Sequence, residues 1–175
     1  MIPVDRFLPH VLPYVPGASD PIAFQAIVDT AIDFCRRTLV VQRVDSLDVV
    51  AEQEDYPLTV PAEMELAAML GVGFQGAWLT PVSPDQVNSG VVLTGAAIGT
   101  ATPPQASTPG AYFQKTPEAM SVSLYPLPKD ALANGLTVKS AFMPTEIALN
   151  LDDLLFTDFC EAIAAGAIAR LIAIP

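Results

Sequence analysis

The sequence is poor in charged residues. It has 8 basic and 19 acidic residues in 175, or 15%, where an average soluble protein has about 25%. Hydrophobic residues reach 51%, and the mean hydropathy is +0.43. Few charges are therefore left to cover the surface of a monomer. This composition favours a protein that buries part of its surface against other subunits or other proteins.

Basic residues are the scarcer of the two charge types, and the formal net charge is −11. A protein that binds nucleic acid needs clustered lysine and arginine side chains to neutralise the phosphates. The charge balance therefore argues against a nucleic-acid-binding function. The net charge is still compatible with a protein that lies close to DNA without binding it.

Catalytic residue types are also scarce. His10 is the only histidine, and Cys35 and Cys160 are the only cysteines. Neither cysteine has the flanking residues of a catalytic nucleophile, so both are interpreted as small buried hydrophobic residues. The acidic clusters at 52–55 and 152–153 fit a solvated turn and a helix N-terminus. We therefore expect no catalytic residue, no cofactor, no metal ion and no disulfide framework.

No membrane segment or leader is indicated. The uncharged stretches 66–84 and 86–114 are broken by glycine and proline, whereas a membrane helix needs about 20 predominantly apolar residues. The first residues carry Asp5 and Arg6 among prolines and lack the apolar core of a signal peptide. These features predict a soluble protein made in a reducing compartment.

Two long helices are indicated. The first spans about 20–38 and begins with Asp20 as the N-cap and Pro21 in the first turn, followed by apolar residues at helical spacing. The second spans about 157–174. From Phe159 onward it is apolar nearly all round, which is typical of a helix that is buried or covered by a partner.

The chain between these helices favours β structure. A hairpin is predicted where Met69–Gly73 and Ala77–Thr80 flank a glycine turn, and Trp78 beside it is interpreted as a core residue. Other expected pieces are strands within 39–51, 56–60, 111–115, 121–125 and 136–142, a turn at 133–135, and a short helix over 84–88. Residues 1–18 are expected to be extended, and 89–110 to form a long uncharged loop.

The predicted fold class is α+β, a small bundle of the two long helices with an antiparallel β region between them, in a single domain over 1–175. The terminal helix carries small residues that would let another backbone approach closely. Two partners remain open for it: the first helix of the same subunit, or the surface of another subunit or protein. The candidate interface residues are Phe159, Ile163, Ala165, Gly166, Ala169, Leu171 and Ile172.

Four segments, taken in order, resemble the head-to-tail adaptor (head completion or connector) proteins of tailed bacteriophages. They are the first helix with its Phe-Cys ending, the segment from Glu52 to Val87, the strand SVSLYPLP, and the ending FCEAIAAGAIARLIAIP. The matching positions are Tyr56, Leu58, Pro61, Ala62, Leu79, Pro81, Val82, Ser83, Pro84, Ala169, Arg170, Leu171 and Pro175. The resemblance covers about residues 20–175.

The resemblance implies a structural virion protein of the phage neck, made in the host bacterial cytoplasm. Members form a ring, commonly twelve-fold, that binds the portal protein and the next neck or tail protein, and DNA passes through it without specific binding. Two departures are the long 89–110 loop and the end of this chain at Pro175, where many members continue into an arm that engages the portal. Two alternatives stay open: another neck or tail-end component, such as a stopper or tail terminator, and an enzyme of unknown chemistry.

Overall fold

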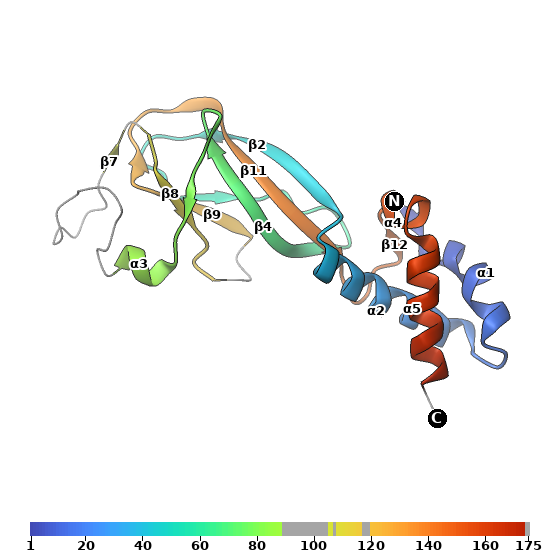
Figure 1. Ribbon diagram of the computed structural model, residues 1–175. Coiled ribbons are helices and arrows are strands. Elements are labelled where there is room, and N and C mark those ends of the chain that lie inside the picture. Colours follow the sequence, from blue (N-terminus) through green and yellow to red (C-terminus); the bar gives the residue numbers. More distant parts are fainter. Residues whose placement is uncertain (89–104, 107, 117–119, 174–175) are drawn as a thin grey trace. The chain divides into compact units, whose positions relative to one another are not determined.

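The computed structural model of the chain describes residues 1–88, 105–106, 108–116 and 120–173 (Figure 1). The chain divides into two compact units. Unit 1 contains residues 1–42, 61–68 and 141–175, and unit 2 contains residues 43–60 and 69–140. Three strands, β2 (Gln42–Val49), β4 (Met64–Phe74) and β11 (Leu132–Pro144), have residues in both.

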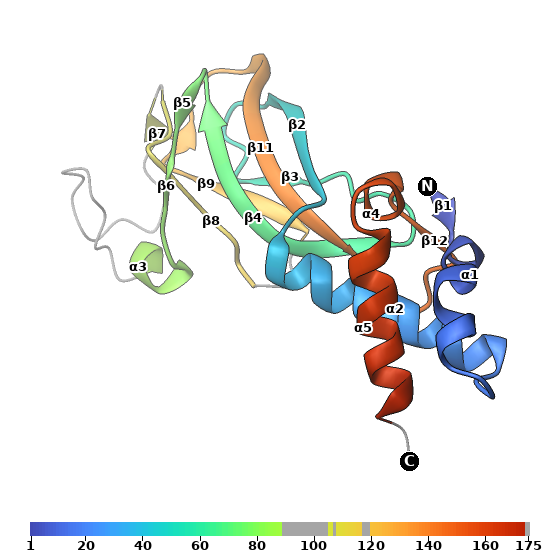
Figure 2. The ribbon, with the colours of Figure 1, turned by 45° about the vertical axis from the view of Figure 1, so that its right-hand side comes forward.

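Unit 1 carries the longer helices. The elements that lie wholly in it are β1 (Ile2–Pro3), η1 (Val4–Phe7), α1 (Leu8–Val11), η2 (Leu12–Tyr14), α2 (Asp20–Thr38), β12 (Asn150–Leu151), α4 (Asp153–Thr157) and α5 (Cys160–Ile172). Helix α5 packs on α2, and α1 contacts both (Figure 2). Strand β1 pairs antiparallel with β12, so Ile2 lies opposite Leu151.

Unit 2 is built from strands. The elements that lie wholly in it are β3 (Asp55–Pro57), β5 (Ala77–Trp78), β6 (Thr80–Pro81), α3 (Pro84–Asn88), β7 (Gln105–Ala106), β8 (Ala111–Phe113), β9 (Ser121–Tyr125) and β10 (Leu127–Pro128). One four-stranded sheet has the order β2-β11-β4-β5 and a second has the order β3-β9-β8-β6, while β10 pairs with β7. Alternate residues of β11, Leu136, Val138 and Ser140, are fully buried, as expected for a strand with one face on the core.

The predicted fold class is wrong. Within the described residues the fold is dominated by β-sheet, with twelve strands in four sheets, and is not a bundle of two long helices around a β region. Strand β4 begins at Met64, in a run of residues with high helix propensity, so tertiary pairing overrides local preference there. Strand β11 continues through the predicted turn at 133–135, although Asn134 has a positive φ of 51° there.

The first predicted helix is confirmed, since α2 spans Asp20–Thr38. Ser19 is its N-cap residue instead of Asp20, and Leu39 ends it in the left-handed conformation with its N–H bonded to the carbonyl of Cys35. The second predicted helix, over about 157–174, corresponds to α5 at Cys160–Ile172, and the short helix α4 at Asp153–Thr157 precedes it. Asp152 caps α4 by accepting a hydrogen bond from the Leu154 N–H at 3.0 Å.

The β4–β5 hairpin is also confirmed, and its turn residues Gln75 and Gly76 both have positive φ. Trp78, however, is 67% exposed, so its interpretation as a core residue is wrong. The ring lies over Gly71 instead, where an added Cβ would come within 3.0 Å of it. The missing side chain leaves room for the indole on the surface of the sheet.

Two segments differ from the predicted extended lead-in and loop. Residues 4–14 form three consecutive helical turns instead of an extended chain, because Pro9 and Pro13 occupy first-turn positions that tolerate proline. The predicted loop 89–110 lies mostly outside the described residues. At 105–106, within that range, the chain forms strand β7.

Candidate functional site

The contact between α2 and α5 is very close at Gly166. A Cβ atom added there would overlap the Cγ2 methyl of Thr30, so no larger residue fits without movement. Nearby, the rings of Phe34 and Phe159 lie with their centroids 5.1 Å apart. Arg170 of α5 also forms an ion pair with Asp33 of α2. The terminal helix therefore packs on the first long helix of its own chain, which is one of the two alternatives that the sequence left open.

The seven candidate interface residues fall into two groups. Ile163 and Leu171 are buried in the subunit, and Phe159 and Gly166 are half-buried at the α2 contact. Ala165, Ala169 and Ile172 are exposed, with Ile172 at 67%. Only the second group is free in the subunit to meet another molecule.

A groove of about 360 Å³ runs along α5 and the N-terminal helical turns. It is lined by Pro9, His10, Pro13, Tyr14, Glu161, Ala164, Ala165 and Ile168. Most of these side chains are apolar or aromatic, and Tyr14 is 69% exposed. We call this the α1–α5 groove. His10, the one histidine of the chain, lies at this groove, and the centroid of its ring lies 6.2 Å from that of the Phe156 ring.

Residues 145–149 form a loop with two exposed apolar side chains, which no pattern in the sequence predicted. Ile147 is 86% exposed and Leu149 is 63% exposed. The loop is nevertheless held firmly, because the carboxylate of Glu63 accepts hydrogen bonds from the backbone N–H groups of Leu149 at 3.0 Å and Asn150 at 2.7 Å. The backbone carbonyl of Glu63 accepts another from Thr145 at 3.0 Å.

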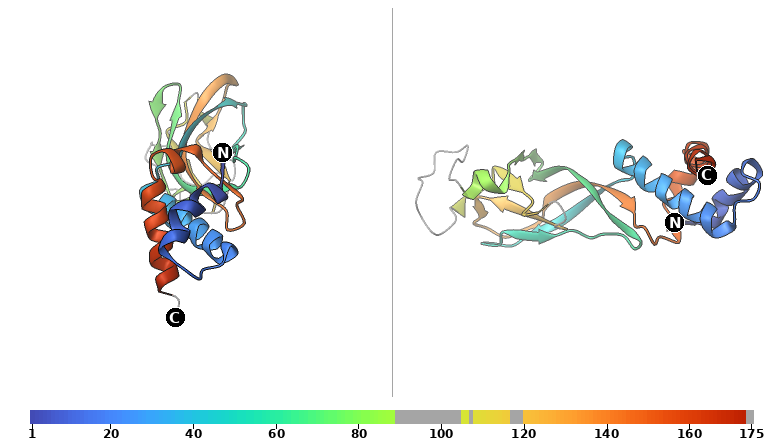
Figure 3. Two further views of the ribbon diagram at one scale, coloured as in Figure 1. Left: turned by 90° about the vertical axis from the view of Figure 1, so that its right-hand side faces the viewer. Right: turned by 90° about the horizontal axis from the view of Figure 1, so that it is seen from below.

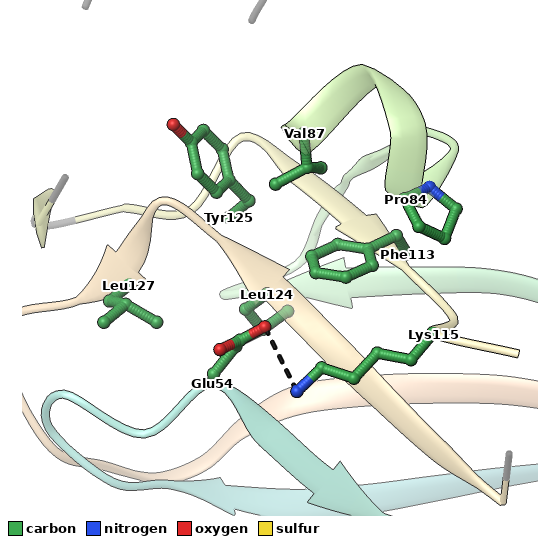
Figure 4. A pocket seen from close by; sticks show the side chains of 8 residues that line it. All are labelled: Glu54, Pro84, Val87, Phe113, Lys115, Leu124, Tyr125 and Leu127. Carbon is green, nitrogen blue, oxygen red and sulfur yellow. Dashed lines mark ion pairs between the residues drawn. The ribbon is translucent and has the colours of Figure 1, made fainter. Parts of the chain in front are cut away.

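Unit 2 has its own pocket, of about 410 Å³ (Figure 4). It is lined by Glu54, Pro84, Val87, Phe113, Lys115, Leu124, Tyr125 and Leu127. The aromatic and aliphatic side chains form most of its wall, and the Lys115 ammonium lies 3.3 Å from Glu54 at one side. The acidic run 52–55, interpreted as a solvated turn, therefore holds a lysine that is distant in sequence.

Lys115 is largely neutralised by its neighbours. Its ammonium also lies 2.6 Å from Asp55, whose second oxygen accepts a hydrogen bond of 2.5 Å from the Ser123 hydroxyl. Burial would raise the pKa of Asp55, but the bonds from Lys115 and Ser123 outweigh it and hold that pKa below its ordinary value. The hydrogen bond to Asp55 and the charge of Glu54 raise the pKa of Lys115. Two carboxylates beside one ammonium make this an unsuitable site for an anion.

The cysteines occupy environments that suppress the thiolate. Burial, assisted by the negative charge of Asp152, raises the pKa of Cys35 to about 12. Burial and the charge of Glu161 also raise the pKa of Cys160. Because the thiolate is the reactive form, neither residue resembles a catalytic cysteine.

Neither a metal cluster nor a membrane span is found in the described part of the chain. Over residues 1–88, 105–106, 108–116 and 120–173, no three histidine, cysteine or acidic side chains gather as a metal site would require. Among the helices of those same ranges, none is both long enough and apolar enough to cross a membrane.

Comparison with known proteins gives the family. No curated protein matches the chain. The family model described as SU10 adaptor protein matches residues 5–173, which is nearly the whole sequence. This match agrees with the resemblance to phage adaptors that the ordered segments indicated. The chain belongs to the SU10 adaptor protein family, and hence to the structural adaptor proteins of bacteriophages.

Proposed function

We propose that this protein is a subunit of a ring in the phage neck, lying beneath the portal and joining the head to the tail. The ring continues the DNA channel from the portal toward the next neck or tail protein. The observation that carries this proposal is the adaptor family match over residues 5–173.

The composition supports such a role. A net charge of −11 gives a channel wall that DNA can slide past, because a basic lining would bind phosphates and slow the passage. Large apolar side chains stay exposed on the single subunit, among them Tyr14, Ile147 and Ile172. We infer that some of these side chains are covered in the assembly.

The exposed members of the candidate interface, Ala165, Ala169 and Ile172, lie on the side of α5 that α2 leaves uncovered. We assign these three to contacts outside the subunit. Ile163, Gly166 and Leu171 support such contacts indirectly, because their packing in unit 1 fixes the position of α5.

The test is assembly on the portal protein of the same phage. The two proteins are expressed together, and the complex is purified, imaged and weighed. We expect a ring of about twelve copies seated on the portal, and the added mass divided by the subunit mass of 18.5 kDa gives the copy number. A folded protein that remains a monomer and never joins the portal would contradict the proposal.

A further inference from the structure

Two apolar surfaces of unit 1 have complementary forms. The 145–149 loop projects Ile147 and Leu149, and the α1–α5 groove is a hollow lined mainly by apolar side chains. In Figure 3 the loop and helix α5 lie on opposite sides of α2. We propose that Ile147 and Leu149 of one copy insert into the α1–α5 groove of the next copy. This inference rests on the proposed ring and adds the surfaces through which neighbouring subunits meet.

The loop is organised for binding before any partner arrives. Residues 145, 149 and 150 are each bonded to Glu63, and the N–H of Val4 bonds to the carbonyl of Leu149 at 3.0 Å. The loop therefore loses little conformational freedom on association, which lowers the entropic cost of binding. A branched apolar side chain at 86% exposure, held on so constrained a backbone, has the features of an interface anchor.

The groove suits such an anchor. Two small residues line the groove, the buried Ala164 and the exposed Ala165, and Pro13, Tyr14 and Ile168 add larger apolar side chains. Prolines carry little side-chain entropy to lose, and tyrosine is among the residues that are frequent at protein interfaces. The groove and the loop thus bring apolar side chains to one contact, and each also carries an exposed carboxylate, Glu161 in the groove and Glu146 in the loop.

The placement of the two surfaces selects a second copy as the occupant. Because the loop and helix α5 lie on opposite sides of α2, two copies can meet head to tail, and each copy then uses its loop on one neighbour and its groove on the other. Contacts of this heterologous type generate closed rings when the rotation between copies allows it. Each contact is small, so the portal template and the closure of the ring contribute to stability through multivalency.

Cross-linking tests the contact directly. Ile147→Cys and Ala165→Cys are combined in one chain with Cys160→Ser, assembled on the portal, and treated with a short bismaleimide. We expect a ladder of covalent oligomers that extends toward the full ring. Each single variant alone gives monomers, and a mixture of the two single variants gives dimers.

A charge substitution gives an independent readout. Ile147→Asp removes the anchor and brings a carboxylate toward Glu161 of the groove. We expect about a 30-fold loss of ring assembly, the size of a hot-spot deletion. Adding Glu161→Lys should restore part of it, since the two charges are then opposite. Ile22→Asp is the matched control, because Ile22 is exposed on α2 at 51% and lies outside both surfaces.

The outcomes separate this inference from the proposed function. Rings that assemble on the portal but show no 147–165 cross-link, and that tolerate Ile147→Asp as well as Ile22→Asp, would overturn the inference and leave the function standing. Cross-links from position 147 to the portal instead of to a second copy would also overturn it. Absence of any ring with the unmodified chain would contradict the proposed function itself.

Discussion

Thr30 on α2 and Gly166 on α5 meet so closely that the Cγ2 methyl of Thr30 occupies the space of a Gly166 side chain. The Thr30 hydroxyl donates a hydrogen bond of 2.7 Å to the carbonyl of Ala26. The methyl group and the glycine therefore set the distance between the two longest helices of unit 1. This spacing in turn fixes α5, and with it one wall of the α1–α5 groove.

Gly166→Ala should destabilise the protein. The added methyl overpacks the α2–α5 contact, which costs about 1–3 kcal/mol, and each kcal/mol lowers the melting temperature by about 2–4 °C in a protein of this size. Thermal unfolding measures the loss. Thr30→Ser keeps the hydroxyl and removes the methyl, so we expect it to restore part of the stability of Gly166→Ala.

Gly110→Ala is the matched control for that substitution. An added Cβ at Gly110 meets no atom of the described residues within 4 Å, so the melting temperature should stay close to that of the wild-type protein. If Gly166→Ala melts no lower than Gly110→Ala, the two helices do not pack as described.

How far the sequence predicts the structure depends on whether the signal is local. The ends of α2 follow from Ser19, Asp20, Pro21 and the polar last turn, all of which lie in the helix or directly before it. The short α3 is equally local, since Ser83 and Gln86 cap each other through their side chains and backbone N–H groups. Such elements can be read from a few neighbouring residues.

The prediction of the fold class failed where contacts between residues distant in the sequence determine the structure. The sequence predicts the first hairpin strand only from Met69, because the residues before it have high helix propensity, but β4 begins at Met64, where pairing with the distant strand β11 overrides that propensity. The candidate site was missed for the same reason. Nothing near Ile147 in the sequence shows that Glu63 holds its loop, and the interface prediction therefore fell on α5 alone.

The Asp55–Lys115 pair should give a small, pH-dependent contribution to stability. Because the pKa of Asp55 is lower in the folded protein than its ordinary 3.8, the contribution is complete above about pH 4 and disappears as the pH falls through the folded value. Both side chains are nearly half exposed, so it should stay below about 1 kcal/mol. Urea unfolding of the wild-type protein and Asp55→Asn at pH 7 and pH 3 measures it.

The stability difference between those two proteins should shrink at the acid pH. Asp130→Asn, which alters an exposed carboxylate of the same unit, serves as the control for the general effect of removing a negative charge. A difference that stays constant between pH 7 and pH 3 would show that Asp55 is not held by Lys115 and Ser123.

The two thiols should react at very different rates with a disulfide reagent such as Ellman's reagent. In the native protein at pH 8, Cys35 should not react with the reagent, because it is fully buried and its pKa is raised to about 12. Cys160 is half-buried with a raised pKa and should react slowly. Both should react at once in denaturant. With Cys160→Ser, rapid reaction of the native protein would contradict the burial of Cys35.

Trp78 should behave as a surface residue that nevertheless stabilises its hairpin. It is the only tryptophan, so its fluorescence reports on one site. Because the Trp78 side chain is 67% exposed, acrylamide should quench its fluorescence readily in the native protein, and unfolding should shift the emission only slightly.

Trp78→Ala uncovers Gly71 and Gly73 of β4 and should lower the free energy of unfolding by up to about 1 kcal/mol, which is typical of a cross-strand pair. Trp78→Phe keeps an aromatic cover and should cost less. A strongly protected indole, or equal stability of the alanine and phenylalanine variants, would contradict the placement of the ring over these glycines.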